Sequence, residues 1–395
     1  MAAGSVPLMS PLGPKEETLL EEFFVLVSQF AFDKAKEIMD KRKESQKSVF
    51  GSSWALLIHS LSQLAVAEKT YTSLGFLEQK GFFTRSKDTL KNCYNSLIQE
   101  FRKVEETVRG LDSQNYGMPR PTLEFEQLLA HLCGQLSSYE QIHIMGQTKH
   151  VSFGDLSTVI TEIIQSHSKG FHHPLLVPLK AAFGYECDII NHLLQAQLLM
   201  YEWQFLQSLL HLHQAHTKLA SWGASVQIKE GKKSTFGGKS SGLPALYEWL
   251  VHLKLHLLSK FTIYFYDTLQ SQATPSEMKT LCNKTYEDFV TRIHTFQKKS
   301  DAYHVSLVLD SQDVEGQGSP TAGYTLPDRV IEAPTGLDSF PVIFSCPGEK
   351  PASHWPNVVM LISDRKDVLS ATHDKIQYLY DKASIRVCTR PETLA

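Results

Sequence analysis

The segment at residues 178–223 constrains the fold of this chain more than any other stretch. Its apolar residues recur at steps of three, four or seven, which is the period of an α-helix. They form two neighbouring rows: Phe183, Cys187, Ile190, Leu194, Leu198, Tyr201, Phe205, Leu209, Leu212 and Leu219, and beside them Ile189, Leu193, Met200, Trp203, Leu206 and Leu210. A helix with so wide an apolar surface must be covered on more than one side. We therefore expect one continuous central helix, roughly 65–70 Å long, that begins at Pro178 and ends at Gly223.

The same periodicity fills most of the chain before residue 300. It predicts helices at about 15–30 (continuing with a bend to 39), 52–78, 87–109, 122–145, 153–167, 245–271 and 275–296. Ser152 with Asp155, and Thr274 with Pro275 and Glu277, are typical of helix starts. Residues 15–300 are thus expected to form an all-α bundle, which follows a flexible lead at 1–14 and carries a flexible loop at 224–243.

The character of the sequence changes near residue 301. Short β-type runs are expected at 304–310, 340–346, 357–363 and 385–389, with a helix at 364–380 and a flexible loop at 311–339. Residues 301–395 therefore indicate a small α/β domain, whose sheet we expect to be incomplete at the chain end. The fold class is mainly α.

Composition excludes several classes of protein. A formal net charge of −3 argues against a nucleic-acid binder that depends on phosphate contacts. The six cysteines include no CxxC pair, which favours free thiols in a reducing compartment. The N-terminus lacks the pattern of a signal peptide, and residues 48–67, although free of charge, are too polar for a spanning helix. We expect a soluble protein with at most peripheral membrane association.

Histidines are the first candidates for chemistry. His211 and His213 point about 200° apart on a helix, so they cannot share a metal on one face. His213 and His216 are neighbours at i,i+3 but lack a third ligand. His252 and His256, at i,i+4, are the best pair, yet a catalytic zinc needs a third ligand and no HExxH motif is present. A helical metal- or ligand-dependent enzyme using His252 and His256 remains the alternative to ordinary hydrogen-bonded histidines.

The loop at 229–239 is the second candidate. Residues 236–240 end like a phosphate loop, but Lys233 stands where the motif requires glycine and no strand precedes it. Lys229, Lys232, Lys233 and Lys239 could touch anionic lipid, although a solvated loop is the favoured interpretation.

Other polar residues suggest no reaction. Asp301, Asp310 and Asp313 have no identifiable base or metal partner, and His172-His173-Pro174 is expected to shape the turn into the central helix. No catalytic, cofactor or metal residue is assigned, and an enzyme is not expected.

Several strings together resemble the KICSTOR subunit 2 family, over about residues 16–391. They are Asp33–Lys36, Ala67–Lys69, Phe171–Leu175, Glu202-Trp203, Ala215–Leu219 with Trp222-Gly223, Ser276–Leu281 and His354–Val358.

The resemblance implies a non-enzymatic scaffold with a helical domain and a roadblock-like C-terminal α/β domain. It implies assembly with kaptin, an integrin-type FG-GAP repeat protein and the large seizure-threshold protein. That assembly would sit peripherally on lysosomes, recruit GATOR complex 1 to the Rag GTPases and restrain TOR complex 1 when amino acids or glucose are scarce. Family members continue beyond the Thr-Arg-Pro-Glu string at 389–392, whereas this sequence stops at Ala395, so a truncated or alternative form is expected. Which surfaces would bind which partner is left open.

Overall fold

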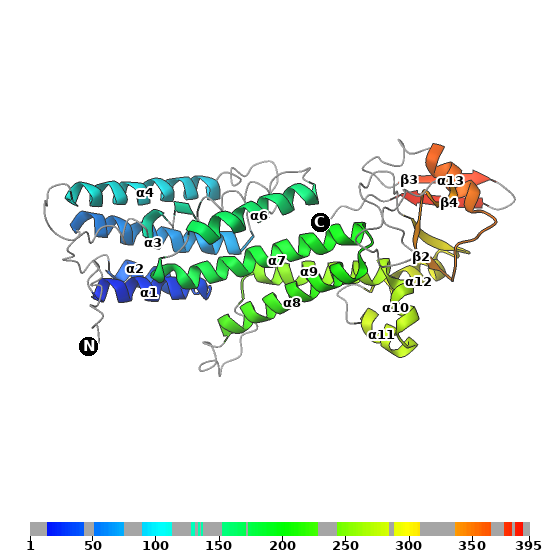
Figure 1. Cartoon of the computed structure of the whole chain (residues 1–395), viewed down its shortest axis with the longest axis horizontal. Coiled ribbons are helices and arrows are strands. Elements are labelled where there is room, and N and C mark those ends of the chain that lie inside the picture. The colour runs from blue at the N-terminus through cyan, green and yellow to red at the C-terminus, as the bar shows by residue number, and fades with distance from the viewer. Residues whose placement is uncertain are drawn as a thin grey trace, which may run out of the picture. The chain divides into compact units, whose positions relative to one another are not determined.

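The computed structural model describes most of the chain as helix, which confirms the mainly α fold class (Figure 1). The described residues are 14–42, 51–74, 89–112, 128–130, 133–134, 136, 152–170, 173–227, 243–283, 288–308, 336–364, 375–380 and 384–389. Most of the helix predicted at 122–145, and most of the loops predicted at 224–243 and 311–339, lie outside them.

The chain divides into two compact units, each made of two segments. Unit 1 comprises residues 1–195 and 212–254, and unit 2 comprises residues 196–211 and 255–395. These boundaries fall inside helices. The division predicted near residue 301 stays a prediction. Three long helices, those at 177–201, 205–227 and 245–264, each contribute residues to both units. Because the helical period continues through each boundary, no change in the sequence pattern indicates where one unit ends.

Unit 1 begins with helices that run back and forth along one another. They are α1 (Pro14–Ser28), α2 (Phe32–Arg42), α3 (Gly51–Thr72), α4 (Thr89–Asp112) and α6 (Phe153–Gly170). The bend predicted near residue 30 is a complete break: Phe30 has φ 61°, and the Ala31 amide donates to the Leu26 carbonyl at 2.9 Å. Ser152 caps α6 by accepting from the Asp155 amide at 3.0 Å, as the sequence predicted.

The predicted continuous central helix is wrong. The segment forms α7 (Val177–Tyr201) and α8 (Phe205–Gln227), which lie side by side (Figure 1). Between them Trp203 has φ 56°, and the Gln204 amide donates to the Leu199 carbonyl at 2.9 Å, which closes the end of α7.

The reversal is stabilised by contacts between the two arms. Lys218 on α8 donates to Asp188 on α7 at 2.6 Å, and the Tyr185 ring stacks on Trp222 with centroids 6.4 Å apart. Asp188 and Lys218 are equally far from Trp203 in sequence, and Tyr185 and Trp222 are nearly so, as antiparallel helices require. The apolar rows that indicated a helix covered on several sides are therefore covered in part by the segment's own second half.

Gly223 does not end a helix, because α8 continues to Gln227. It lies instead where α9 (Ala245–Tyr264) approaches α8. A Cβ at Gly223 would be 2.6 Å from the hydroxyl oxygen of Tyr247, and that hydroxyl donates to the Leu219 carbonyl at 2.9 Å. Gly223 therefore leaves space for the Tyr247 side chain and does not terminate the helix.

We expect Gly223→Ala to lower the free energy of unfolding by about 1–2 kcal/mol, because the Tyr247 hydroxyl would lose its bond to Leu219. Gly184 in α7 is the matched control, since a Cβ there would meet nothing within 4 Å. Gly184→Ala should stabilise the protein by about 0.5–1 kcal/mol through helix propensity. Urea denaturation of both variants measures the difference, and a stabilising Gly223→Ala would contradict the assigned contact.

Unit 2 continues with short helices. The helix predicted at 245–271 ends at Tyr264 and resumes as α10 (Tyr266–Gln272), and the one predicted at 275–296 is divided into α11 (Pro275–Asn283) and α12 (Phe289–Lys299). The predicted start of α11 is confirmed: the Thr274 amide donates to Glu277 at 2.8 Å, and the Glu277 amide to the Thr274 hydroxyl at 3.4 Å.

The C-terminal part holds two antiparallel strand pairs among the described residues. Strand β1 (Val305–Val308) pairs with β2 (Val342–Cys346), and β3 (Lys375–Tyr380) pairs with β4 (Ser384–Thr389). The predicted strands at 304–310, 340–346 and 385–389 are confirmed where they are described. A short 3₁₀ turn, η4 (Gly336–Asp338), precedes β2. A roadblock-like arrangement of these strands stays a prediction.

Two predictions in this part are wrong. The run 357–363, predicted as a strand, lies in helix α13 (Trp355–Asp364), and residues 375–380, predicted as the end of a helix, form β3. A short apolar run is compatible with a buried helix as well as with a strand, so the residues that pack against it determine which one forms. Here Trp355 and Val359, one helical turn apart, pack with Phe340 beside the first strand pair.

Candidate functional site

A buried cluster of two carboxyl and two phenol side chains joins three helices of unit 1. Glu186 on α7 is 3 % exposed, and the Tyr71 hydroxyl on α3 donates to its Oε1. Glu68, also on α3, is 4 % exposed. Burial raises the pKa of Tyr94 on α4, and the charges of Glu68 and Glu186 raise it further, which places all three groups together.

Within this cluster, ionisation of the Glu186 carboxyl is expected to affect the stability of the fold near neutral pH. Burial raises its pKa from 4.5 to about 7, and the hydrogen bond from Tyr71 opposes that rise. Near neutral pH a substantial fraction of Glu186 is therefore protonated in the folded chain. The residue lies within the segment that the sequence marked as central, but periodicity assigns Glu186 no role.

The turn at Trp203 organises an aromatic cluster in unit 2. Trp203 is 1 % exposed, stacks on Tyr264 with centroids 5.5 Å apart and meets Phe265 edge-on. Lys260 lies beside it, with its Nζ 4.8 Å from the Tyr201 ring centre and 5.1 Å from that of Tyr264. Such cation–π contacts stabilise a buried ammonium group over the aromatic faces. The cluster stabilises the reversal between α7 and α8.

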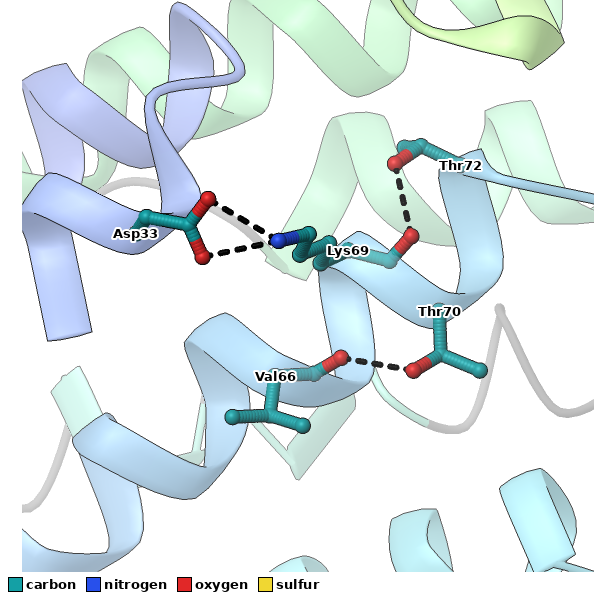
Figure 2. A network of polar contacts seen from close by, with 5 residues as sticks. All are labelled: Asp33, Val66, Lys69, Thr70 and Thr72. Carbon is teal, nitrogen blue, oxygen red and sulfur yellow. Dashed lines mark hydrogen bonds and ion pairs between the residues drawn. The ribbon is translucent and has the colours of Figure 1, made fainter.

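Figure 2 shows an ion pair that links α2 and α3. The Lys69 ammonium lies 2.8 and 2.9 Å from the two carboxylate oxygens of Asp33. The same two helices are tied at the other end of their contact by the Ser62 hydroxyl, which donates to Asp40 at 2.8 Å. The strings Asp33–Lys36 and Ala67–Lys69, far apart in sequence, thus meet through their charged residues.

We expect this ion pair to contribute little to stability. The side chains of Lys69 and Asp33 are 57 % and 81 % exposed, so water screens their attraction. A double-mutant cycle with Asp33→Ala and Lys69→Ala should give a coupling energy of about 0.2–1 kcal/mol, which falls in high salt. The pair between Lys41 and Glu37 within α2 is the control for an exposed contact that joins no second helix. A coupling above about 2 kcal/mol would show that the pair has a larger role.

The predicted histidine candidates lie on α8 and α9. His216 has a pKa lowered by burial first and then by the charges of Lys254 and His213, so a cation is already close to it. His252 and His256 both lie on α9. Among the described residues, no three His, Cys, Asp or Glu side chains are grouped to hold a metal ion. Within that part of the chain, His252 and His256 have no third ligand beside them, and an enzyme that uses the pair stays the alternative.

The remaining candidates have structural roles or lie outside the description. His173 caps the turn before α7, because its Nδ1 accepts from the Leu175 amide at 3.2 Å, as predicted for this turn. Asp301 has φ 53° directly after α12. His172, Asp310, Asp313 and the loop at 229–239 are outside the described residues.

Exposed apolar side chains were not predicted as a separate group. On α8, Leu206, Leu209 and Leu210 are 48 %, 37 % and 50 % exposed, although the sequence placed them in the apolar rows of a covered helix. Apolar residues left at a helix surface at this spacing are typical of protein contacts. In the described part of the chain, no helix is both long enough and apolar enough to cross a membrane.

The geometry defines a mainly helical protein in which several polar contacts join neighbouring helices and several apolar side chains are exposed. Residues 9–394 match the family described as "KICSTOR complex C12orf66 like". The chain is 40% identical to the KICSTOR subunit 2 of Xenopus laevis over 409 residues, which covers 98% of this chain and 89% of the relative. It is also 40% identical to the KICSTOR subunit 2 of Danio rerio over 402 residues, covering 96% and 87%. The chain belongs to this family, as the sequence strings indicated.

Proposed function

We propose that this chain is a non-enzymatic scaffold subunit of the KICSTOR complex. The observation that carries the proposal is the 40% identity to proteins named KICSTOR subunit 2, which extends over almost the whole chain and so includes both units. Identity spread over nearly the whole chain favours a role that this chain shares with its relatives through the entire fold, and the proposal therefore does not depend on a single motif.

The proposed role has a specific setting. The chain would assemble with kaptin, the integrin-type FG-GAP repeat protein and the large seizure-threshold protein on the cytoplasmic face of lysosomes. Through that assembly it would tether GATOR complex 1 near the Rag GTPases and restrain TOR complex 1 when amino acids or glucose are scarce. The neighbouring exposed leucines of α8 support a role in binding other proteins, since a partner that covers them would remove apolar surface from water.

A scaffold also fits the polar chemistry of the described residues better than an enzyme does. The buried Glu186–Tyr71 pair lies between packed helices, and the histidine pair on α9 lacks a third ligand among them. Glu186 and Tyr94, whose pKa values are raised by burial, therefore lie in contacts between packed helices.

Co-purification tests the proposal. The tagged chain, expressed at its natural level, should recover the other three KICSTOR subunits from cells deprived of amino acids, and GATOR complex 1 with them. Cells that lack the chain should keep TOR complex 1 active during starvation, and the wild-type chain should restore its inhibition. Recovery of none of the three subunits would overturn the proposal.

Lysosomal placement is tested separately with the loop at 229–239. If partners recruit the chain, replacing Lys229, Lys232, Lys233 and Lys239 by alanine should leave its lysosomal fraction unchanged. A loss of that fraction with the complex intact would instead assign recruitment to lipid contact by the loop.

A further inference from the structure

Three basic side chains of unit 1 lie together where α8 and α9 pack. They are His213 and His216 on α8 and Lys254 on α9. The two histidines are three positions apart, so they share a face of α8. Burial lowers the pKa of His216, and the charges of Lys254 and then His213 lower it further, which requires that the three groups are close to one another.

Contacts that involve no charge show how α8 and α9 are aligned. The Tyr247 hydroxyl on α9 donates to the Leu219 carbonyl on α8 at 2.9 Å. Farther along the same helices, the Phe261 ring stacks on Phe205 with centroids 5.3 Å apart. The later contact on α9 thus meets the earlier residue on α8, so the two helices run antiparallel.

This alignment brings Lys254 to the histidines. Lys254 lies midway between the two contact residues of α9, and Leu212 lies midway between the two contact residues of α8, so Lys254 and Leu212 are opposite each other. His213 follows Leu212 directly, and His216 is about 6 Å farther along the helix axis at 1.5 Å per residue. A lysine side chain can span that distance. The packing of the helices therefore agrees with the electrostatic effect on His216.

The acidic residues of the helices around this cluster are engaged or directed elsewhere. Helix α8 contains no Asp or Glu. On α7, Asp188 lies 2.6 Å from Lys218, and Glu186 is buried against α3. Glu248, the acidic residue of α9, is six positions before Lys254 and so about 120° away around the helix. None of the described ion pairs includes Lys254, whose pKa is lowered by burial.

We propose that His213, His216 and Lys254 form a binding site for a phosphate monoester group, carried by a soluble small molecule or by a lipid headgroup. Basic groups held close together repel one another, and a bound anion replaces that repulsion by attraction. A phosphate monoester carries about −1.5 to −2 charges near neutral pH and has three strong acceptor oxygens, one for each basic side chain. The inference goes beyond the proposed function and does not depend on it.

Other ligands fit these three side chains less well. A carboxylate carries a single negative charge and two acceptor oxygens, so it would leave part of the cluster unneutralised. A divalent metal ion would be repelled by Lys254, and the described residues supply no third His, Cys, Asp or Glu ligand. A phosphate monoester matches both the charge and the number of donors.

Nuclear magnetic resonance of the full-length chain, isotope-labelled at its histidine rings, tests the site. At constant ionic strength, with chloride as the reference anion, methyl phosphate should shift the His213 and His216 signals saturably in the millimolar range. The pH at which His216 is half protonated should rise with the anion bound, because the anion favours the cationic imidazole. His294 on α12 is the internal reference and should not respond. The absence of a saturable shift, or an equal shift of His294, would overturn the proposal.

Substitutions of lysine provide the second measurement. Lys254→Gln should weaken methyl phosphate binding at least fivefold, whereas Lys254→Arg keeps the charge and should retain most of the affinity. Lys279→Gln on α11 removes the same charge elsewhere and should change the affinity less than twofold. Acetate, as a carboxylate, should bind the wild-type chain at least threefold more weakly than methyl phosphate. Equal effects of Lys254→Gln and Lys279→Gln, or equal binding of the two anions, would contradict the assigned site.

Vesicles distinguish the two sources of the phosphate group. Phosphatidylcholine vesicles that contain phosphatidic acid, a lipid whose headgroup is a phosphate monoester, are compared with vesicles of matched surface charge that contain phosphatidylserine. A headgroup ligand predicts at least fivefold more full-length chain sedimenting with the phosphatidic acid vesicles, and Lys254→Gln should remove that preference. Equal sedimentation with both vesicles, together with the saturable shift by methyl phosphate, assigns the site to soluble phosphate monoesters.

Discussion

Trp203→Ala is expected to lower the free energy of unfolding by about 3–5 kcal/mol, the range for removing a fully buried tryptophan. The indole is 1 % exposed and lies against Tyr264 and Phe265, so alanine would leave a cavity in the aromatic cluster. Alanine would also keep the backbone at φ 56°, a conformation that costs energy for any residue with a Cβ. Chemical denaturation, followed by far-ultraviolet circular dichroism, measures the change.

The control for Trp203 lies a few residues along the same segment. Leu206 is 48 % exposed, and Leu206→Ala should change the free energy of unfolding by no more than about 0.5 kcal/mol. Similar costs for the two variants would contradict the assignment of Trp203 as the packed residue of the reversal. They would instead favour the continuous helix that the periodicity predicted.

Glu186→Gln is expected to change how stability depends on pH. Because the pKa of Glu186 is raised in the folded chain, the folded state binds more protons than the unfolded state between pH 4.5 and about 7. The contribution of this residue is therefore most favourable at low pH and is lost as the pH rises through about 7. Above that pH the buried carboxylate costs about 3 kcal/mol, because a tenfold change in a proton-binding constant corresponds to about 1.4 kcal/mol.

The measurement is the difference in unfolding free energy between Glu186→Gln and the wild type at several pH values. Relative to its value at pH 4.5, that difference should move in favour of the variant by about 3 kcal/mol at about pH 8, because glutamine cannot ionise. Tyr71→Phe is the matched control: it keeps the carboxyl but removes the hydrogen bond that lowers its pKa, so the transition should move to higher pH. A difference that is the same at both pH values would contradict the buried ionisation.

The candidate features were visible in the sequence only as separate parts. The strings around Asp33 and Lys69 carried the family resemblance, but their contact depends on α2 and α3 packing antiparallel. Glu186 occupies an unremarked position in a periodic segment. Its environment, a buried space between three helices, arises from residues distant in sequence, which no local pattern contains.

The strand and helix predictions after residue 301 show the same dependence. The β1 and β2 runs are short and bounded by turn residues, so they were recognisable locally. The run in α13 is equally apolar, and its state follows from packing Trp355 and Val359 on Phe340. The preference of a short segment for helix or strand determines its structure only where tertiary contacts do not favour the other state.

The sequence by itself determined that the chain is mainly α and that residues 178–223 are helical and central, because a 3.6-residue period is a property of the residues alone. It also determined the helix starts at Ser152 and Thr274, which depend on groups within three positions. Only the tertiary structure decided that the central segment reverses at Trp203. The apolar rows are the same in one long helix and in two antiparallel ones, and the choice belongs to the aromatic side chains that bury the indole. Part of the surface that was expected to await other helices is instead where α7 and α8 meet each other.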